Sequence, residues 1–141
     1  MRYTLSRIHS GQEEIFLRTG TAQSTVTLQN TARAMGSGSL EVFATPALVA
    51  LMESAACNAL EGTLEEGVTT VGVEICVEHL AATPVGMAVR AEAALISQEG
   101  RAYAFSIEAF DEAGLIGKAE HRRVAVKAER FQQKAEAKKN N

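Results

Sequence analysis

The chain has 141 residues, of which 46% are hydrophobic and 22% charged, and its formal net charge is −3. This length suits one domain around a single core, and the mild negative charge argues against nucleic acid as a partner. No stretch approaches the roughly 18 apolar residues that cross a bilayer, and residues 1–18 are too charged for a signal peptide. We therefore expect one domain over residues 1–141, without a membrane partner and located in the cytoplasm.

The first part of the chain gives few structural signals. Residues 1–20 are weakly patterned and predict a peripheral arm or a first irregular strand. Residues 21–29 are rich in Thr and Val, which predicts a strand, and the Gly- and Ser-rich residues 35–39 predict a flexible loop. This part offers no chemistry of its own.

Residues 46–60 predict the one long helix, which the composition suggests is buried nearly all round. Thr45 precedes Pro46 and is a candidate N-cap, and Gly62 follows the helix end. Glu53 is the only charge in this helix. The apolar residues that recur at i, i+3, i+4 and i+7 are Leu48, Leu51, Met52, Ala55, Ala56, Ala59 and Leu60.

The rest of the chain predicts strands. Residues 69–79 alternate, so that an inward row ends in a histidine: Val71, Val73, Ile75, Val77, His79. Residues 87–97, 103–111 and 115–127 predict three more strands joined by short turns, which indicates an antiparallel meander. The polar tail, 128–141, predicts a frayed segment or a solvated helix.

Together these elements predict an α+β domain in which a curled antiparallel β-sheet wraps around one long central helix. The edges of such a sheet are open, and pairing with a second copy covers them. We therefore expect a homodimer, or a dimer of dimers. Cys57 and Cys76 lie in apolar stretches without a C-x-x-C motif, which predicts buried, reduced thiols.

Three residues are candidates for chemistry. Glu53 in a nearly apolar helix costs several kcal/mol unless it has partners or faces a cavity, although it also lies away from the centre of the apolar stripe. His79 ends the inward row and can exchange a proton near neutral pH, although such a histidine is more often a core residue. Thr45, besides capping, stands where helix N–H groups can bind a carbonyl oxygen that gains negative charge.

Thr45 and Glu53 are eight positions apart, which separates their backbones by roughly 12 Å at a helical rise of 1.5 Å per residue. If both serve one site, they flank the substrate or come from different subunits. The sequence has no metal-ligand cluster, P-loop, G-x-S-x-G or G-x-G-x-x-G motif, so it implies neither a metal nor a cofactor.

Four runs carry a family resemblance: residues 31–38 (TARAMGSG), 41–46 (EVFATP), 51–53 (LME) and 77–84 (VEHLAATP). In this order and spacing they resemble the fluoroacetyl-CoA thioesterase-like family of hot-dog proteins. The resemblance implies a hot-dog dimer that hydrolyses acyl-CoA thioesters, with catalytic Thr45, Glu53 and His79. It also implies substrate contacts from four residues: Val42, Phe43, Gly72 and Arg123.

Two details qualify this resemblance. Family members that select a fluorinated acyl group carry aromatic residues just before the EVFAT run, and residues 35–40 have none. We therefore expect a short, branched or aryl acyl-CoA as substrate. The run His121-Arg122-Arg123 is similar to a family His-x-Arg element that could meet the phosphates of CoA, but it equally fits a solvated strand face.

Two other functions stay open at this point. The same fold hosts hydratases and dehydratases of acyl thioesters, which also pair a His with an acidic residue. A non-catalytic module that binds or senses acyl-CoA is the second alternative. The set of Thr45, Glu53 and His79 argues against a binder, because binding alone does not need all three.

Overall fold

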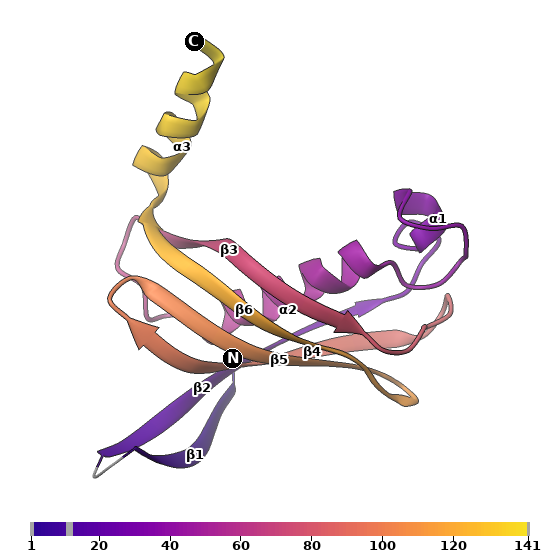
Figure 1. Ribbon diagram of the computed structural model, residues 1–141, viewed down its shortest axis with the longest axis horizontal. Coiled ribbons are helices and arrows are strands. Elements are labelled where there is room, and N and C mark those ends of the chain that lie inside the picture. The colour runs from indigo at the N-terminus through magenta and orange to yellow at the C-terminus, as the bar shows by residue number, and fades with distance from the viewer. Residues whose placement is uncertain (1, 11–12, 141) are drawn as a thin grey trace.

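The computed structural model describes residues 2–10 and 13–140, which form one antiparallel sheet, a central helix and shorter helices (Figure 1). The sheet has six strands in the order β1-β2-β4-β5-β6-β3. The elements in chain order are β1 (Arg2–Ser10), β2 (Glu13–Thr25), α1 (Ala32–Met35), α2 (Thr45–Ala59), β3 (Val68–His79), β4 (Ala88–Glu99), β5 (Ala102–Asp111), β6 (Gly114–Lys127), α3 (Ala128–Glu136) and η1 (Ala137–Asn140).

The sheet curls around α2, as the sequence predicts (Figure 1). The predicted meander is right for β4, β5 and β6, which pair in succession, but wrong for β3. β3 pairs with β6 at the far edge of the sheet, and β4 pairs with β2 instead. The chain therefore crosses the sheet between β3 and β4, which lets a curled sheet enclose the helix with strands on both sides.

The helix α2 lies within one residue of the predicted range, and its apolar stripe packs into the sheet. Each large side chain buried here contributes about 1.5–3 kcal/mol of hydrophobic stabilisation. The helix is not buried all round, because Ala50, Ser54 and Cys57 are exposed on its other side. The buried stripe is Leu48, Leu51, Met52, Ala55, Ala56 and Ala59.

Gly20 on β2 allows α2 to approach the sheet. A Cβ atom at Gly20 would collide with the backbone of Ala55 and Ala59. Small residues on both elements therefore bring the helix backbone directly onto the strand, and the larger side chains of the stripe pack to either side.

A β-bulge in β3 changes which side chains face inward. Gly72 pairs with Arg123 and Glu74 pairs with Arg122, so Val73 is the extra residue of the bulged strand. Before the bulge the inward residues are Thr70 and Gly72, and after it they are Ile75, Val77 and His79. The predicted inward row is thus right from Ile75 onward and wrong at Val71, which lies between the inward Thr70 and Gly72, and at Val73, which is 50% exposed.

Several peripheral predictions differ from the structure. Residues 2–10 and 13–20 belong to a β1–β2 hairpin that extends the sheet, so the arm alternative is wrong and an irregular strand is present, although as two strands instead of one. The strand predicted over 21–29 ends at Thr25. Residue 1, residues 11–12 and residue 141 lie outside the described residues. The tail forms α3 and η1, which have no buried residues and extend away from the sheet, so the solvated-helix alternative for the tail is confirmed (Figure 1). Cys57 and Cys76 are exposed in the single chain, because neither thiol belongs to an inward row.

In the described part of the chain, none of the helices has the length and apolar character that crossing a membrane requires.

Candidate active site

Thr45 is the first residue of α2 and does not cap it. The N-cap residue is Ala44, which makes no side-chain cap, so the predicted capping role of Thr45 is wrong. The first intrahelical hydrogen bond runs from the N–H of Leu48 to the carbonyl of Ala44. The N–H groups before it have no acceptor inside the helix, and together with the helix dipole they favour negative charge at this end.

The hydroxyl of Thr45 instead contacts His79 at the end of β3. Thr45 Oγ1 and His79 Nδ1 lie 2.7 Å apart, within hydrogen-bonding distance. Burial lowers the pKa of His79, although the nearby backbone of Ala81 partly offsets this effect. A neutral imidazole can accept a hydrogen bond from the Thr45 hydroxyl at Nδ1. His79 Nε2 is buried, and no described residue hydrogen-bonds it.

Glu53 belongs to a second group of side chains, on the inner face of β3 and β6. Its Oε2 lies 3.0 Å from Arg123 Nη1, an ion pair in which the arginine side chain is 8% exposed and the glutamate 39%. Arg123 is held in turn by Thr70, whose hydroxyl accepts from Nε at 2.9 Å and whose carbonyl accepts from Nη2 at 3.1 Å. Arg123 is therefore fixed and presents one edge to Glu53.

His121 completes this second group. Its Nε2 lies 3.9 Å from Glu53 Oε2 and 3.2 Å from Arg123 Nη1, and its Nδ1 lies 2.7 Å from the carbonyl of Glu74. The imidazole is almost fully buried beside the Phe105 ring, with 6.1 Å between ring centroids. Burial chiefly lowers the pKa of His121, and the positive charge of Arg123 adds to this effect. A neutral His121 can accept a hydrogen bond from Arg123 at Nε2 without charge repulsion between the two side chains.

Gly72 leaves the space that Glu53 occupies. A Cβ atom there would lie 2.5 Å from Glu53 Oε2 and 3.2 Å from Arg123 Nη1. The strand therefore needs a glycine so that the carboxylate can reach Arg123 across it.

The two groups do not touch within one chain. Thr45 and His79 lie where α2 starts and β3 ends, whereas Glu53 lies two turns along the helix, beside Gly72. Among the described residues, no hydrogen bond or ion pair joins one group to the other. The separation of roughly 12 Å expected from the helical rise applies within the single chain.

The other candidate substrate contacts have structural partners. Phe43 is buried in the core, and Val42, half-buried, forms a β-bridge with Pro84. Together they hold the segment that leads into Thr45. Arg123 points inward, so its solvated-face alternative is wrong, whereas Arg122 does face solvent and pairs with Glu74 at 3.4 Å.

Sequence reasoning gave too little weight to His121 and missed Thr70. A usable signal was present on β6, where every second residue is buried: Ala119, His121, Arg123, Ala125. Two polar residues in such a row indicate an internal network. Nowhere in residues 2–10 and 13–140 do three or more His, Cys, Asp or Glu side chains gather as a metal site would require.

Comparisons with known proteins point to one family of thioesterases. The model of a family described as fluoroacetyl-CoA-specific thioesterase matches residues 26–129. A fluoroacetyl-CoA thioesterase from Streptantibioticus cattleyicolor is 42% identical over 98 residues, which cover 70% of this chain and 70% of that protein.

Solved structures show the same fold. One of the fluoroacetyl-CoA thioesterase FlK superposes with a TM-score of 0.80 at 36% identity, covering 85% of this chain and 93% of that chain. A thioesterase superfamily member from Thermus thermophilus superposes with a TM-score of 0.79 at 29% identity, covering 86% of this chain and 90% of that chain. These likenesses confirm the predicted hot-dog fold.

Proposed function

The chain belongs to the fluoroacetyl-CoA-specific thioesterase family, and from this premise we propose how its residues hydrolyse a thioester and which substrates they take. It is an acyl-CoA thioesterase, which cleaves its substrate to a free acid and CoA. The observation that carries the mechanism is the 2.7 Å contact between Thr45 Oγ1 and His79 Nδ1 at the start of α2.

The thioester carbonyl binds at the start of α2. The N–H groups that precede the first intrahelical bond stabilise the negative charge that develops on the carbonyl oxygen, and Thr45 positions the carbonyl. The neutral imidazole of His79 orients the Thr45 hydroxyl. The Nε2–H of the neutral His79 then donates a hydrogen bond to the departing CoA sulfur.

Glu53 activates the attacking water as a general base. Its Oε2 is held by Arg123, and no described residue hydrogen-bonds Oε1, which leaves that oxygen for the water. The water oxygen attacks the carbonyl carbon, one water proton goes to Glu53, and the bond to sulfur breaks; Glu53 then gives this proton to the CoA thiolate and returns to its ionised form. A single turnover in labelled water should place the label in the acid, whereas an acyl group trapped on Glu53 or Thr45 would show a covalent route instead.

The complete site lies between two subunits of a homodimer. β3 is an edge strand, and antiparallel pairing with the same strand of a second copy, centred midway between Gly72 and His79, would bring the His79 end of one strand close to the Gly72 region of the other. Thr45 and His79 would then meet the partner subunit's Glu53. This arrangement overcomes the separation of the two groups within one chain.

Subunit mixing tests the shared site. Thr45→Ala and Glu53→Gln should each be inactive alone. Mixed and re-equilibrated, they should recover roughly a quarter of wild-type activity, because half of the dimers are heterodimers with one intact site. No recovery, although heterodimers form, would place both groups in one site of one chain.

The acyl group is short and not restricted to fluoroacetyl. Residues 35–40 contain no aromatic residue, and Met35 and Leu40 are exposed, so this segment does not cover the acyl group. A related FlK structure holds fluoroacetate and CoA. We expect kcat/KM for fluoroacetyl-CoA and acetyl-CoA to agree within about tenfold, a difference of 1.4 kcal/mol. Strong preference for the fluorinated ester would overturn this part of the proposal.

We also propose a cytoplasmic location, which accords with a CoA ester as substrate. The mechanism above uses no cofactor, because CoA is part of the substrate.

The first test is thiol release from a panel of acyl-CoA esters, with wild type beside Glu53→Ala and His79→Ala. Turnover by wild type that both variants lose, with folding intact by circular dichroism, would support these roles. Full activity in either variant would remove that residue from the mechanism. Binding without turnover on every ester would favour an acyl-CoA sensor, and a change in enoyl absorbance without thiol release would favour a hydratase.

A further inference from the structure

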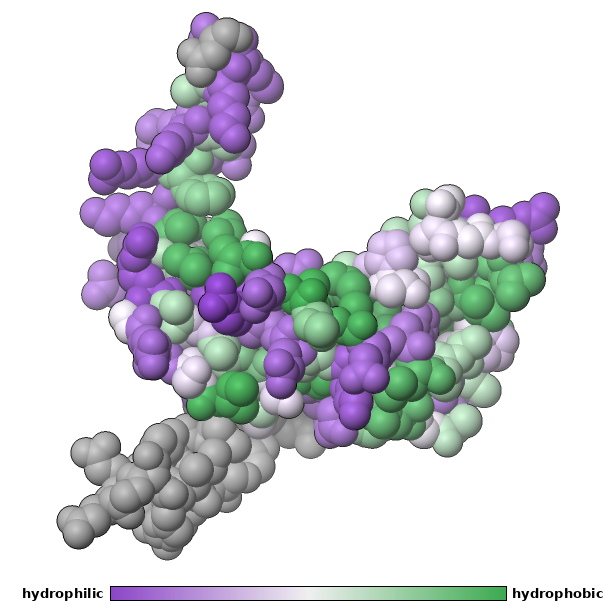
Figure 2. Space-filling view, viewed as in Figure 1, coloured by the Kyte–Doolittle hydropathy of each residue, from purple (hydrophilic) through white to green (hydrophobic). Residues whose placement is uncertain are grey.

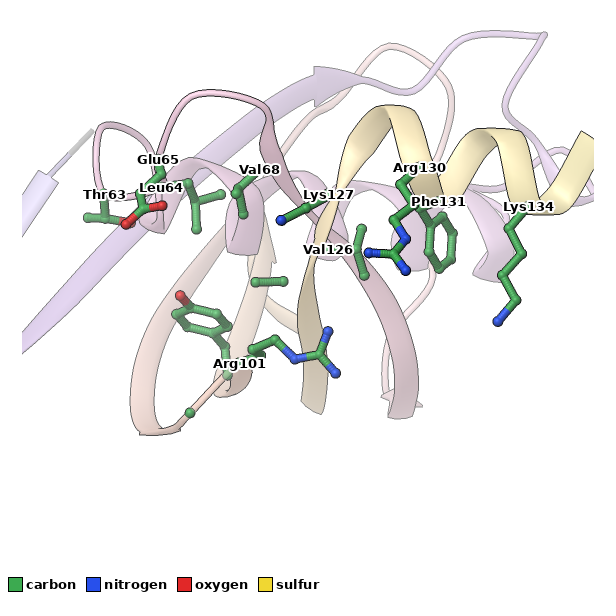
Figure 3. Close-up of a pocket in the computed structure, with 13 residues that line it drawn as sticks. Thr63, Leu64, Glu65, Val68, Arg101, Val126, Lys127, Arg130, Phe131 and Lys134 are labelled. Atoms are coloured by element: carbon green, nitrogen blue, oxygen red, sulfur yellow. The ribbon is translucent and has the colours of Figure 1, made fainter.

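A hollow of about 610 Å³ lies where α3 leaves the sheet, outside the residues of the candidate active site. Its walls come from the segment after α2, from the β5 and β6 strands and from one side of α3 (Figure 3). Apolar side chains gather in the angle between α3 and the sheet, bordered by hydrophilic ones (Figure 2). The hollow is thus apolar at its base and polar at its rim, as small-molecule sites are.

The rim is strongly basic. Four cationic side chains line the hollow, Arg101, Lys127, Arg130 and Lys134, against one acidic side chain, Glu65. The chain as a whole carries a formal net charge of −3, so the positive charge of this cluster is opposite in sign to the net charge of the protein. Such a concentration of positive charge on one hollow favours a ligand with several negative charges, above all phosphates.

Helical spacing places the α3 cations on one side. Arg130 and Lys134 are four positions apart on α3, with Phe131 between them, and Lys127, the last residue of β6, lies three positions before Arg130. Phe131 is 47% exposed and projects into the hollow beside Arg130 (Figure 3). An exposed aromatic ring between cations is suited to stack on a heterocyclic base whose phosphates the cations bind.

Residues at the base of the hollow lie next to the Glu53 group on the inner face of the sheet. Tyr103 lines it and pairs directly with Arg123 across the β5–β6 ladder, so both side chains lie on one face. Val68, which also lines it, is four residues before Gly72 on the same inner row of β3. At about 3.3 Å per residue, the base of the hollow lies roughly 13 Å from Gly72 and the Glu53 carboxylate.

This distance matches the pantetheine arm of CoA. The arm has the backbone length of about four residues, which spans roughly 14 Å when extended. We propose that the hollow under α3 binds the 3′-phosphorylated ADP portion of acyl-CoA, with Arg130 and Lys134 on its phosphates and Phe131 against its adenine. The assignment rests on the proposed thioesterase function and adds a second subsite to it.

The test compares an acyl-CoA with the matching acyl-pantetheine, which lacks the nucleotide. For Arg130→Ala/Lys134→Ala, KM for the acyl-CoA should rise roughly fivefold to tenfold, with kcat unchanged, since each exposed charge contact contributes up to about 1 kcal/mol. Its kinetics on the acyl-pantetheine should equal those of wild type. Added salt should raise KM for the acyl-CoA only.

Lys138→Ala/Lys139→Ala is the matched control. It removes two cations from the next turn, outside the hollow, where Lys139 pairs with Glu136 at 2.7 Å. Both substrates should be turned over by this variant as by wild type. An unchanged KM in Arg130→Ala/Lys134→Ala, an equal rise on acyl-pantetheine, or an equal rise in the control would each overturn the assignment.

Binding measurements separate this assignment from the thioesterase proposal. Adenosine 3′,5′-bisphosphate should bind wild type more tightly than Arg130→Ala/Lys134→Ala by calorimetry, even if no thioester is hydrolysed. Equal competition by inorganic phosphate would make the hollow a general anion site and overturn the assignment to CoA. A change of molecular mass in the double variant would do the same, because the hollow would then be a contact between subunits.

Discussion

Gly72 determines how close the Glu53 carboxylate can come to β3. The residue is in an inner row, and the carboxylate passes over it to reach Arg123. A side chain at this position would displace the end of a flexible glutamate and not the backbone, so the fold should persist while the geometry of the site changes.

Gly72→Ala should therefore lower kcat by about a hundredfold, because a displacement of roughly 1 Å of a reacting group costs this much. Steady-state kinetics at saturating acyl-CoA measures the effect, with thermal denaturation to show that the protein is folded. Thr69→Ala, at an exposed position of the same strand, is the control. Wild-type kcat in Gly72→Ala would show that Glu53 does not act from this position.

The acid limb of kcat/KM should follow His79. Burial lowers the pKa of His79 below the ordinary 6.5, so the imidazole stays neutral at and above pH 6.5 and becomes protonated only as the pH falls through the lowered value. A protonated ring cannot accept from Thr45. The limb should therefore have its midpoint below pH 6.5 in a pH–rate profile.

His121 also has a lowered pKa, so a His121→Gln variant is the control for this assignment. The limb should keep its midpoint in His121→Gln. A limb that moves with His121, or one centred at or above 6.5 in wild type, would contradict the role of His79.

At the scale of elements, α2 joins the sheet through backbone contact. Gly20→Ala should destabilise the protein by about 2–3 kcal/mol, because its Cβ would meet main-chain atoms of Ala55 and Ala59, which cannot move aside without shifting the helix. Urea denaturation measures the change. Ser24→Ala, exposed on the same strand, should leave the free energy of unfolding nearly unchanged. An equal effect of both substitutions would rule out this packing explanation.

Local patterns predicted most elements but not how they pair. The helix 46–60 and the strands after it follow from apolar spacing, which each segment carries in itself. The position of β3 beside β6 depends on contacts between distant segments, and no turn signal specifies it. The predicted inward row of β3 is wrong at Val71 and Val73 because the bulge reverses the alternation before Ile75, and the regular spacing of the valines gives no sign of a bulge.

For the candidate site too, local features of the sequence could be predicted, whereas contacts between distant segments could not. Thr45, Glu53 and His79 stood out because each is polar in an apolar setting or at a helix start. The capping role failed because His79, 34 residues away, competes for the Thr45 hydroxyl. Arg123 could be placed only once its inner row was known, since Arg122 next to it has the same chemistry and faces solvent.

At the scale of the whole molecule, the open edge of β3 is the surface on which the proposed dimer depends. Val73→Lys should raise the dimer dissociation constant by about tenfold or more, because it replaces an exposed apolar side chain with a charge on each of the two paired edge strands. Light scattering after size-exclusion chromatography measures it. Ile96→Lys is the matched control, since Ile96 on β4 is 49% exposed and Val73 is 50% exposed. Dissociation by both substitutions, or by neither, would place the interface elsewhere.

The bulge also constrains the transfer of this site to another protein scaffold, because it keeps Gly72 and His79 on one face of the strand. Gly72 and His79 are seven residues apart, and in an unbroken pleat an odd separation turns two side chains to opposite sides. A graft onto a regular strand must therefore delete one residue between them or import the irregularity whole. For the same reason, a regular strand with glycine and histidine seven positions apart would align with β3 without a gap, but its two side chains would point to opposite sides of the sheet.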